Sequence, residues 1–194
     1  MKKNDFILKI YSLSQTVYST KEIGLLFTDI SYNNIKARLN YFVRTKKLLN
    51  PARGLYTKKD FNKLELATKI YTPSYISLET ILAKVGVVFQ TYDSIFAMSY
   101  VNRQIRLKDK TIVIFKRLKS QILTSKLGID KERDYFVASP ERALIDAVYI
   151  YKDYHFDNLS PINWERVFEI APIYKSKILL KRLESYYKFA KDNV

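Results

Sequence analysis

The stretch SYNNIKARLNYFVRTKKLLNPARGLYT, residues 31–57, constrains the fold of this chain more than any other. It begins with Ser31, a favourable helix N-cap, and continues with apolar residues at helical spacing to about residue 47. Two short apolar pieces, LLN and LYT, then flank PARG, whose Pro and Gly suit a tight turn. The stretch therefore predicts a helix followed by a β-hairpin.

Two further helices are expected before this stretch. Residues 5–13 place apolar side chains on one helical face, and Ser19 or Thr20 can cap a short helix in KEIGLLF. Helix, short helix, polar helix and hairpin follow one another in the order of a winged helix-turn-helix. We therefore expect an α+β protein in which residues 1–60 form an N-terminal winged helix-turn-helix DNA-binding domain.

The polar helix of this unit has two different faces. Ile35, Leu39, Phe42 and Val43 form a stripe for burial, and the opposite face is polar and basic. Asparagine can pair with adenine in the major groove, alanine can contact the thymine methyl group, and Arg and Lys suit phosphates. The DNA contacts predicted on this face and at the turn of the hairpin are Ser31, Asn33, Lys36, Ala37, Asn40, Tyr41, Arg44, Lys47 and Arg53.

The charge of the chain bears on this interpretation. The sequence holds 34 Lys and Arg against 19 Asp and Glu, a net charge of +15. Such an excess attracts polyanions, so nucleic acid, an acidic membrane surface and an acidic protein are the candidate partners. Residues 1–64 alone hold 13 basic and 4 acidic residues. This charge favours DNA as the partner of the polar helix, and a winged helix that docks a protein is the alternative.

Residues 61–194 are expected to form a second domain of helices and an antiparallel sheet. Strands are predicted in SIFAMSYV, KTIVIFKRL and RDYFVAS, and Trp164 is interpreted as a core anchor. The last helix is expected to turn Ile178, Leu179, Leu183 and Tyr186 inward. The helices are predicted near residues 61–71, after a Ser77 cap, after Ser139-Pro140, after Ser160-Pro161 and over about residues 173–191.

Three pieces occur in order along the first three quarters of the chain: the predicted winged helix ending in RGLYTKK, then YISLETILAKVGVV, then YFVASPERALIDAVYIY. In these pieces the chain resembles the AbiEi antitoxins of bacterial type IV toxin-antitoxin systems, which act in abortive infection, a form of phage defence. The resemblance implies a transcriptional autorepressor that binds operator DNA with inverted repeats, as a monomer or as a dimer assembled on DNA. It also implies a C-terminal antitoxin domain, residues 61–194, that antagonises a nucleotidyltransferase-like toxin without a stable complex.

A second basic segment, residues 103–126, holds eight basic residues opposed only by Asp109. Apolar and basic residues alternate in it, which predicts a half-buried pair of strands with cations on exposed faces and turns. Such a patch suits a second DNA contact, a surface for RNA or an acidic partner, or a solvated sheet face that prevents aggregation. The cations of this patch are Arg103, Arg106, Lys108, Lys110, Lys116, Arg117 and Lys119.

We expect no catalysis, no cofactor and no metal. The chain has no Cys, a single His155, and too few glycines for a Walker A loop or Gly-x-Gly-x-x-Gly. An enzyme or accessory subunit acting on nucleic acid is the alternative, but the Asp and Glu residues do not cluster as two-metal chemistry requires. Glu141, Arg142 and Asp146 are a candidate polar site. We prefer to interpret Glu141 as part of the helix start and Arg142 and Asp146, one helical turn apart, as an exposed pair. The absence of Cys and of a long apolar run fits a cytoplasmic protein without a membrane segment.

Overall fold

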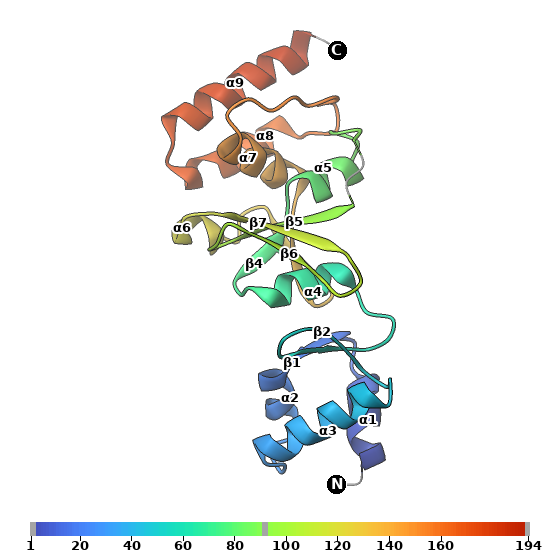
Figure 1. Cartoon of the computed structure of the whole chain (residues 1–194). Helices are drawn as coiled ribbons and strands as arrows, with labels where there is room; N and C mark the ends of the chain where they lie inside the picture. The colour runs from blue at the N-terminus through green and yellow to red at the C-terminus, as the bar shows by residue number, and fades with distance from the viewer. Residues whose placement is uncertain (1–2, 91–92, 193–194) are drawn as a thin grey trace.

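The computed structural model describes residues 3–90 and 93–192 and shows a mixed α+β protein (Figure 1). Its first part combines helices with an antiparallel sheet of strand order β1-β3-β2. The elements of this part are α1 (Lys3–Ser12), β1 (Val17–Ser19), α2 (Thr20–Leu26), α3 (Tyr32–Arg44), β2 (Leu49–Ala52) and β3 (Leu55–Thr57).

The predicted caps lie where α2 and α3 begin. Ser19 and Glu22 form a capping box, in which the Ser19 hydroxyl accepts from the Glu22 N–H at 3.1 Å and the Glu22 carboxylate accepts from the Ser19 N–H at 2.7 Å. The Ser31 hydroxyl accepts from the Asn34 N–H at 3.4 Å. These bonds satisfy N–H groups that have no partner within the helix, so they fix where each helix starts. The end of α3, at Arg44, comes about three residues earlier than predicted.

The helices α1 to α3 share a small apolar core. From α3, the side chains of Ile35, Leu39 and Phe42 are buried as predicted, and Val43 is partly buried. The ring of Phe6 in α1 stacks against that of Phe42 with 5.8 Å between centroids. Burial of this stripe leaves the opposite face of α3 to the solvent.

The remaining residues build a six-stranded sheet with strand order β6-β7-β5-β4-β9-β8 and the helices that pack on it. Strands predicted in SIFAMSYV, KTIVIFKRL and RDYFVAS are confirmed as β5, β7 and β9, whereas β4 and β8 were not predicted. The elements are α4 (Lys63–Ile70), β4 (Ser74–Ile76), α5 (Glu79–Lys84), β5 (Ser94–Ser99), β6 (Arg103–Arg106), β7 (Ile112–Arg117), α6 (Ser120–Leu123), β8 (Ile129–Glu132), β9 (Tyr135–Ala138), α7 (Pro140–Ile150), α8 (Trp164–Ile170), the 3₁₀ helix η1 (Ala171–Tyr174) and α9 (Lys177–Asp192).

The prediction of an antiparallel sheet is wrong, because this sheet is mixed. β5 pairs with β7 in parallel and β4 pairs with β9 in parallel, whereas the pairings β4–β5, β6–β7 and β8–β9 are antiparallel. The cause is the position of β6. It follows β5 in the chain but pairs on the outer side of β7, so β7 lies directly beside β5 and runs in the same direction.

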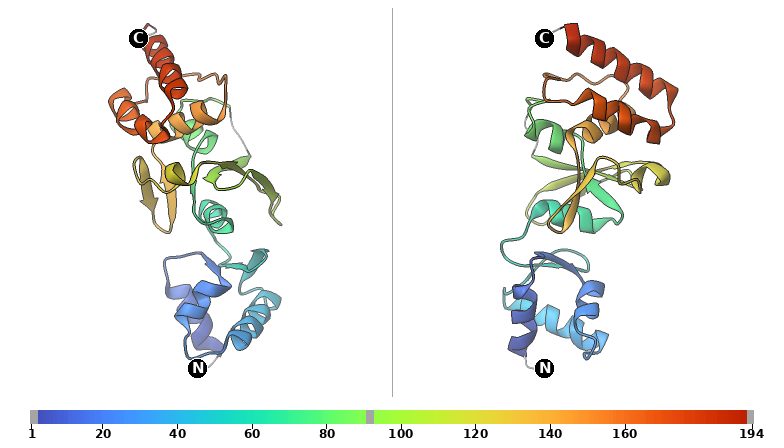
Figure 2. Two further views of the ribbon diagram at one scale, coloured as in Figure 1. Left: turned by 90° about the vertical axis from the view of Figure 1, so that its left-hand side faces the viewer. Right: turned by 180° about the vertical axis from the view of Figure 1, so that it is seen from behind.

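Helices cover both faces of the six-stranded sheet. α5, α7, α8 and α9 lie on one side, and α4 lies on the other, between this sheet and the N-terminal elements (Figures 1 and 2). α7 contacts α5, α8 and α9, and is therefore the central helix of its layer. The predicted domain boundary at residue 60 lies in the loop between β3 and α4.

Polar contacts join α4 to the N-terminal elements. The Glu65 carboxylate accepts from the N–H groups of Thr16 at 3.0 Å and Val17 at 3.1 Å. The Lys69 ammonium donates to the Glu22 carboxylate at 2.5 Å. These bonds fix α4 against β1 and the start of α2.

Replacing Glu22 with Gln is expected to change how stability depends on pH. Burial alone would raise the pKa of Glu22, but hydrogen bonds from Lys69 and Ser19 lower it below its ordinary value. A carboxylate of this kind stabilises the fold above its unfolded pKa of about 4.3, and that contribution is lost as the pH falls through the folded pKa. Urea unfolding of both proteins at several pH values should show a shallower loss of stability on acidification for Glu22→Gln. Equal pH dependence of the two proteins would contradict the role assigned to this carboxylate.

Three predicted helix features are wrong in detail. Ser77 does not cap α5, because its hydroxyl donates to Asp146 and the N-cap position is Leu78. The Ser160-Pro161 pair does not start α8, which begins at Trp164 with Asn163 as its cap. Ile178 of α9 is 67% exposed, whereas Leu179 and Leu183 are buried as predicted. Ser139 does cap α7, since its hydroxyl accepts from the Arg142 N–H at 3.2 Å.

Replacing Gly128 with Ala is expected to destabilise the protein by about 1–3 kcal/mol. Gly128 has a φ of +68°, and an added Cβ would lie 2.8 Å from Cδ1 of Ile170 and 2.9 Å from Cβ of Arg142. Gly24→Ala is the control, because a Cβ there meets nothing within 4 Å and Ala favours the helix. Thermal melting should show a lower Tm for Gly128→Ala and an equal or higher Tm for Gly24→Ala. The reverse order would show that the site around Gly128 is not packed as described.

Candidate nucleic-acid interface

The face of α3 opposite its buried stripe is accessible. Among the predicted contact residues of this face, only Tyr41 is partly buried, with its ring 5.4 Å from that of Phe42. The others are exposed: Ser31 at the cap, Asn33, Lys36, Ala37, Asn40 and Arg44 on the helix, and Lys47 just after it. The periodicity of the sequence therefore assigned the two faces of α3 correctly.

This face carries positive charge without an acidic residue on the helix itself. α3 has the sequence YNNIKARLNYFVR, which contains no Asp or Glu. The Lys36 ammonium lies 4.4 Å from the ring centroid of Tyr32, and the Arg44 guanidinium lies 5.9 Å from that of Tyr41. Such contacts are weak at exposed sites, so both cations can turn toward a bound anion at little cost.

The turn between β2 and β3 presents Arg53 to the solvent. Gly54 adopts a φ of +75°, which reverses the chain, and its carbonyl accepts from the Thr20 N–H at 3.0 Å. The Asn50 side-chain amide donates to the carbonyls of Ala52 at 2.9 Å and Leu55 at 2.8 Å. The turn is thus fixed both internally and to the start of α2, and it holds Arg53 at its tip.

The second basic patch is divided by the fold. The predicted strand pair is confirmed as β6 and β7, whose antiparallel register places Arg103 opposite Phe115 and Arg106 opposite Ile112. Arg103 and Arg106 therefore lie about 10 Å apart along the strand. Arg106, Lys108 and Lys110 lie at the β6–β7 turn, and Arg103, Lys116, Arg117 and Lys119 lie at or beyond the other end. Among these seven cations only Lys116 is partly buried.

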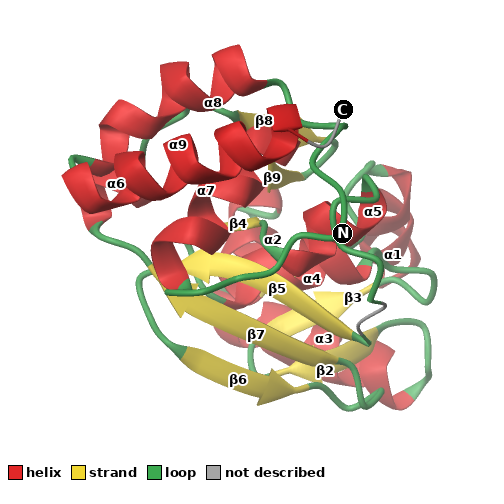
Figure 3. Cartoon of the chain, turned by 90° about the horizontal axis from the view of Figure 1, so that it is seen from above, coloured by secondary structure: helices red, strands yellow, loops and turns green. Residues whose placement is uncertain are grey.

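The β6–β7 turn meets the N-terminal unit, which the sequence did not predict. The Lys108 ammonium donates to the Asn50 carbonyl at 2.5 Å, which joins the turn to β2. The Lys63 ammonium of α4 donates to Thr111 at 2.8 Å and pairs with Asp109 at 3.0 Å, so it fixes the same turn within the C-terminal unit. The left view of Figure 2 and the view of Figure 3 both place α3, the β2–β3 hairpin and this turn on one side of the molecule. The cations of the turn therefore extend the basic side of the N-terminal unit.

The interpretation of Arg142 and Asp146 as an exposed pair is wrong. Both side chains are 0% exposed, with Nε of Arg142 3.7 Å from Oδ1 of Asp146. Asp146 also accepts from the hydroxyls of Tyr75 at 2.9 Å, Ser77 at 2.8 Å and Tyr174 at 2.5 Å. The spacing was correct, but helix α7 is buried from Glu141 to Val148. The apolar residues of SPERALIDAV spread over more than half of the helix circumference, wider than the stripe of a helix with one buried face, and this was the sign of burial.

This buried cluster joins distant parts of the C-terminal unit. Arg142 donates to the carbonyls of Ile122 at 2.8 Å and Leu127 at 3.0 Å. Burial raises the pKa of Asp146, against the opposing effects of Arg142 and the hydroxyl donors. Burial and the nearby Asp146 raise the pKa of Tyr75 and Tyr174 well above the ordinary value, so both phenols remain donors. The cluster links α7, β4, η1 and the segment around α6, and its side chains do not reach the solvent.

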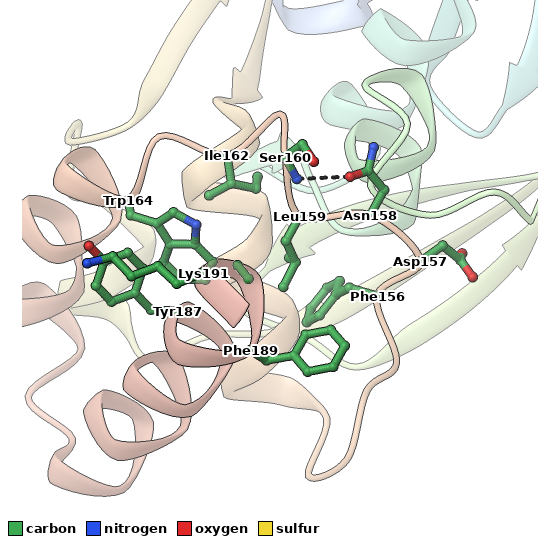
Figure 4. Close-up of a pocket in the computed structure, with 11 residues that line it drawn as sticks. Phe156, Asp157, Asn158, Leu159, Ser160, Ile162, Trp164, Tyr187, Phe189 and Lys191 are labelled. Atoms are coloured by element: carbon green, nitrogen blue, oxygen red, sulfur yellow. Dashed lines mark hydrogen bonds between the residues drawn. The ribbon is translucent and has the colours of Figure 1, made fainter. Parts of the chain in front are cut away.

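A groove of about 550 Å³ lies where α9 crosses the loop before α8 (Figure 4). Trp164, Tyr187 and Phe189 line it together with the ammonium of Lys191, which lies 4.7 Å from the Tyr187 ring centroid. Trp164, predicted as a core anchor, is only partly buried and forms part of this groove. The Asn158 side chain accepts from the Ser160 N–H at 2.9 Å and orders the loop.

The described residues contain no group of three or more His, Cys, Asp or Glu side chains placed to bind a metal ion. His155 is exposed, 3.9 Å from Asp157. None of the helices in the described part of the chain combines the length and the apolar character that crossing a membrane requires. No protein-family model matches the chain, and no curated protein matches it either.

Proposed function

We propose that the N-terminal unit is a winged helix-turn-helix that binds operator DNA, with α3 as the recognition helix and the β2–β3 turn as the wing. The observation that carries this proposal is the exposed face of α3, which has cations and amides and no acidic residue. Two features of the topology also support it, because both are typical of winged helices. The elements follow the chain order helix, strand, helix, helix, strand, strand, and the strands pair in the order β1-β3-β2. An α-helix of this kind fits the major groove of B-DNA.

The contacts divide by chemistry. Asn33 and Asn40 carry amides that suit the edge of adenine, and Ala37 between them suits a thymine methyl group. Lys36, Arg44 and Lys47 provide charge for phosphates on either side of the groove. Arg53 at the tip of the wing suits the neighbouring minor groove or its backbone. The β6–β7 turn would add backbone contacts from Arg106, Lys108 and Lys110, since it lies beside β2.

We further propose that the chain is an autorepressing antitoxin of a type IV toxin-antitoxin system. This part rests on the resemblance of the quoted sequence pieces to AbiEi antitoxins, with residues 61–194 opposing a nucleotidyltransferase-like toxin in the cytoplasm. A cofactor, a metal and catalysis have no part in this function. Inverted repeats in the operator would recruit two copies of the chain, each reading one half-site.

A fragment of residues 1–60 should separate the two activities. We expect it to bind DNA weakly, because it keeps α3 and the wing but loses the cations of the β6–β7 turn. We expect it not to relieve growth arrest when it is co-expressed with the proposed nucleotidyltransferase-like toxin, whereas the full chain should. A fragment that rescues growth would refute the assignment of the antitoxin activity to residues 61–194.

A further inference from the structure

Two adjoining grooves open where β5 and β7 end. These parallel strands finish side by side, with Ser99 opposite Arg117, and Figure 3 shows both arrowheads at the same edge of the sheet. The grooves have volumes of about 570 Å³ and about 520 Å³ and share Asn102 and Arg117 as lining residues. The carboxyl ends of adjacent parallel strands are a common place for ligands in proteins with parallel strands.

The charge of both grooves is of one sign. Arg117 and Lys119 line the larger groove, Arg103, Lys116 and Arg117 line the smaller one, and no Asp or Glu lines either. The ion pairs found in the described part of the chain include none of these four cations. Four cations without a neighbouring carboxylate provide a site for an anion with more than one negative charge.

Protection of a sheet edge accounts for some of these cations but not for all of them. It explains Arg103 and Arg106 on the edge strand β6. Lys116 and Arg117 belong to β7, but β6 does not cover them, so edge protection explains them as well. Lys119 lies after the end of β7 and belongs to no strand, so edge protection does not explain it. The pairing of β6 with β7 ends at Phe115, and the smaller groove lies along the uncovered residues that follow.

The polar groups of the grooves are also held in place. The Arg103 guanidinium donates to the Tyr71 hydroxyl at 3.3 Å, and the Lys116 ammonium lies 5.5 Å from the Tyr151 ring centroid. Oδ1 of Asn102 accepts from the Arg117 N–H at 2.7 Å. Asn102 is thereby fixed through its oxygen, and its amide NH₂ is the end that can donate to a ligand.

An aromatic ring stands beside the cations. Tyr100 lines the larger groove and is 47% exposed, and its ring packs edge-on against that of Tyr71 with 5.8 Å between centroids. An exposed and fixed ring next to cations is the combination with which proteins bind single-stranded nucleic acid, because the ring stacks on a base and the cations bind phosphates. A duplex offers no exposed base faces for such stacking.

We propose that these grooves bind a nucleotide, either free or within a single strand of RNA, with its phosphates on Arg117 and Lys119 and its base on Tyr100. The site lies at the end of β6 and β7 opposite the turn that contacts Asn50, so it is separate from the interface proposed for operator DNA. Its ligand differs from the operator in offering a base that is not stacked within a duplex.

The test uses the full chain and three probes: a fluorescein-labelled oligouridylate of about eight nucleotides, guanosine triphosphate, and inorganic tripolyphosphate. Fluorescence anisotropy measures oligouridylate binding, and the other two probes serve as competitors. Arg117→Ala with Lys119→Ala should weaken oligouridylate binding at least about tenfold, since two phosphate contacts are lost. Lys181→Ala with Lys188→Ala, two exposed cations of α9, is the control with the same change of charge and should weaken it less than about twofold.

Tyr100→Ala should weaken binding of the oligouridylate and of guanosine triphosphate but not of tripolyphosphate. If guanosine triphosphate displaces the labelled oligouridylate, a free nucleotide is a ligand of the grooves. If the oligouridylate binds and guanosine triphosphate does not displace it, the ligand is a single strand. The proposal is overturned if both charge variants lose equal affinity, if Tyr100→Ala has no effect, or if tripolyphosphate competes as well as the nucleotide probes. Binding of the upstream duplex, measured in parallel on Arg44→Ala, reports separately on the operator interface, and melting curves show that each variant is folded.

Discussion

Replacing Asp146 with Ala is expected to lower the free energy of unfolding by about 3–5 kcal/mol. The change leaves the Arg142 guanidinium buried without its counter-charge, and it removes the acceptor of three hydroxyl groups. A buried charge without a partner cannot be solvated, so this cost exceeds that of any exposed pair in the protein. Urea unfolding followed by circular dichroism measures the loss.

Lys84→Ala provides the comparison for this variant. Lys84 pairs with Glu132 at 3.7 Å, but its side chain is 67% exposed, so its loss should cost no more than about 1 kcal/mol. If Asp146→Ala and Lys84→Ala prove equally stable, the Arg142–Asp146 cluster does not hold the C-terminal unit together. Because the cluster lies far from α3, neither substitution should alter DNA binding by the folded protein.

The second large effect concerns the exposed amides of α3. Asn33→Ala and Asn40→Ala should each weaken binding to the operator by about 1–3 kcal/mol and change binding to unrelated duplex little, because each removes a group suited to one base edge. Binding isotherms on both duplexes measure the difference. The control is Ile35→Ala, which empties the buried side of the same helix and should lower the Tm instead.

A different pattern would contradict the assignment of faces on α3. If Asn33→Ala and Asn40→Ala bind the operator normally while Ile35→Ala abolishes binding without loss of stability, the buried stripe would be the face that meets DNA. Its burial against Phe6 and the other core residues predicts the opposite result.

The sequence predicted the N-terminal unit better than the C-terminal one for a physical reason. In α2 and α3 the caps Ser19 and Ser31 and the apolar spacing are local, so they could be recognised within a few residues. The short strand β4 consists of three residues and exists only because β5 and β9 pair with it from either side. Such pairing depends on distant segments, which local patterns do not report.

The candidate nucleic-acid interface was likewise predicted where local patterns determine it and missed where contacts between distant segments do. The exposure of Asn33 and Arg44 followed from helical periodicity, and the strand pair at residues 103–117 followed from alternation. The sequence did not predict that the basic patch is divided between the two ends of the strand pair. That division depends on the β6–β7 register and on the contact between Lys108 and Asn50. The burial of Arg142 was missed because a spacing of four residues shows which side chains meet, not whether solvent reaches them.

The salt dependence of operator binding tests the central claim most directly. The affinity of the full chain for its own upstream duplex should fall steeply with salt, with a slope of log K against log[salt] of about −5 or steeper if two copies each neutralise several phosphates. Arg44→Ala and Arg53→Ala should each make the slope shallower by about one per copy and weaken binding to operator and unrelated duplex alike. A slope near zero, or no binding even at low salt, would contradict the proposal that α3 and the wing bind DNA.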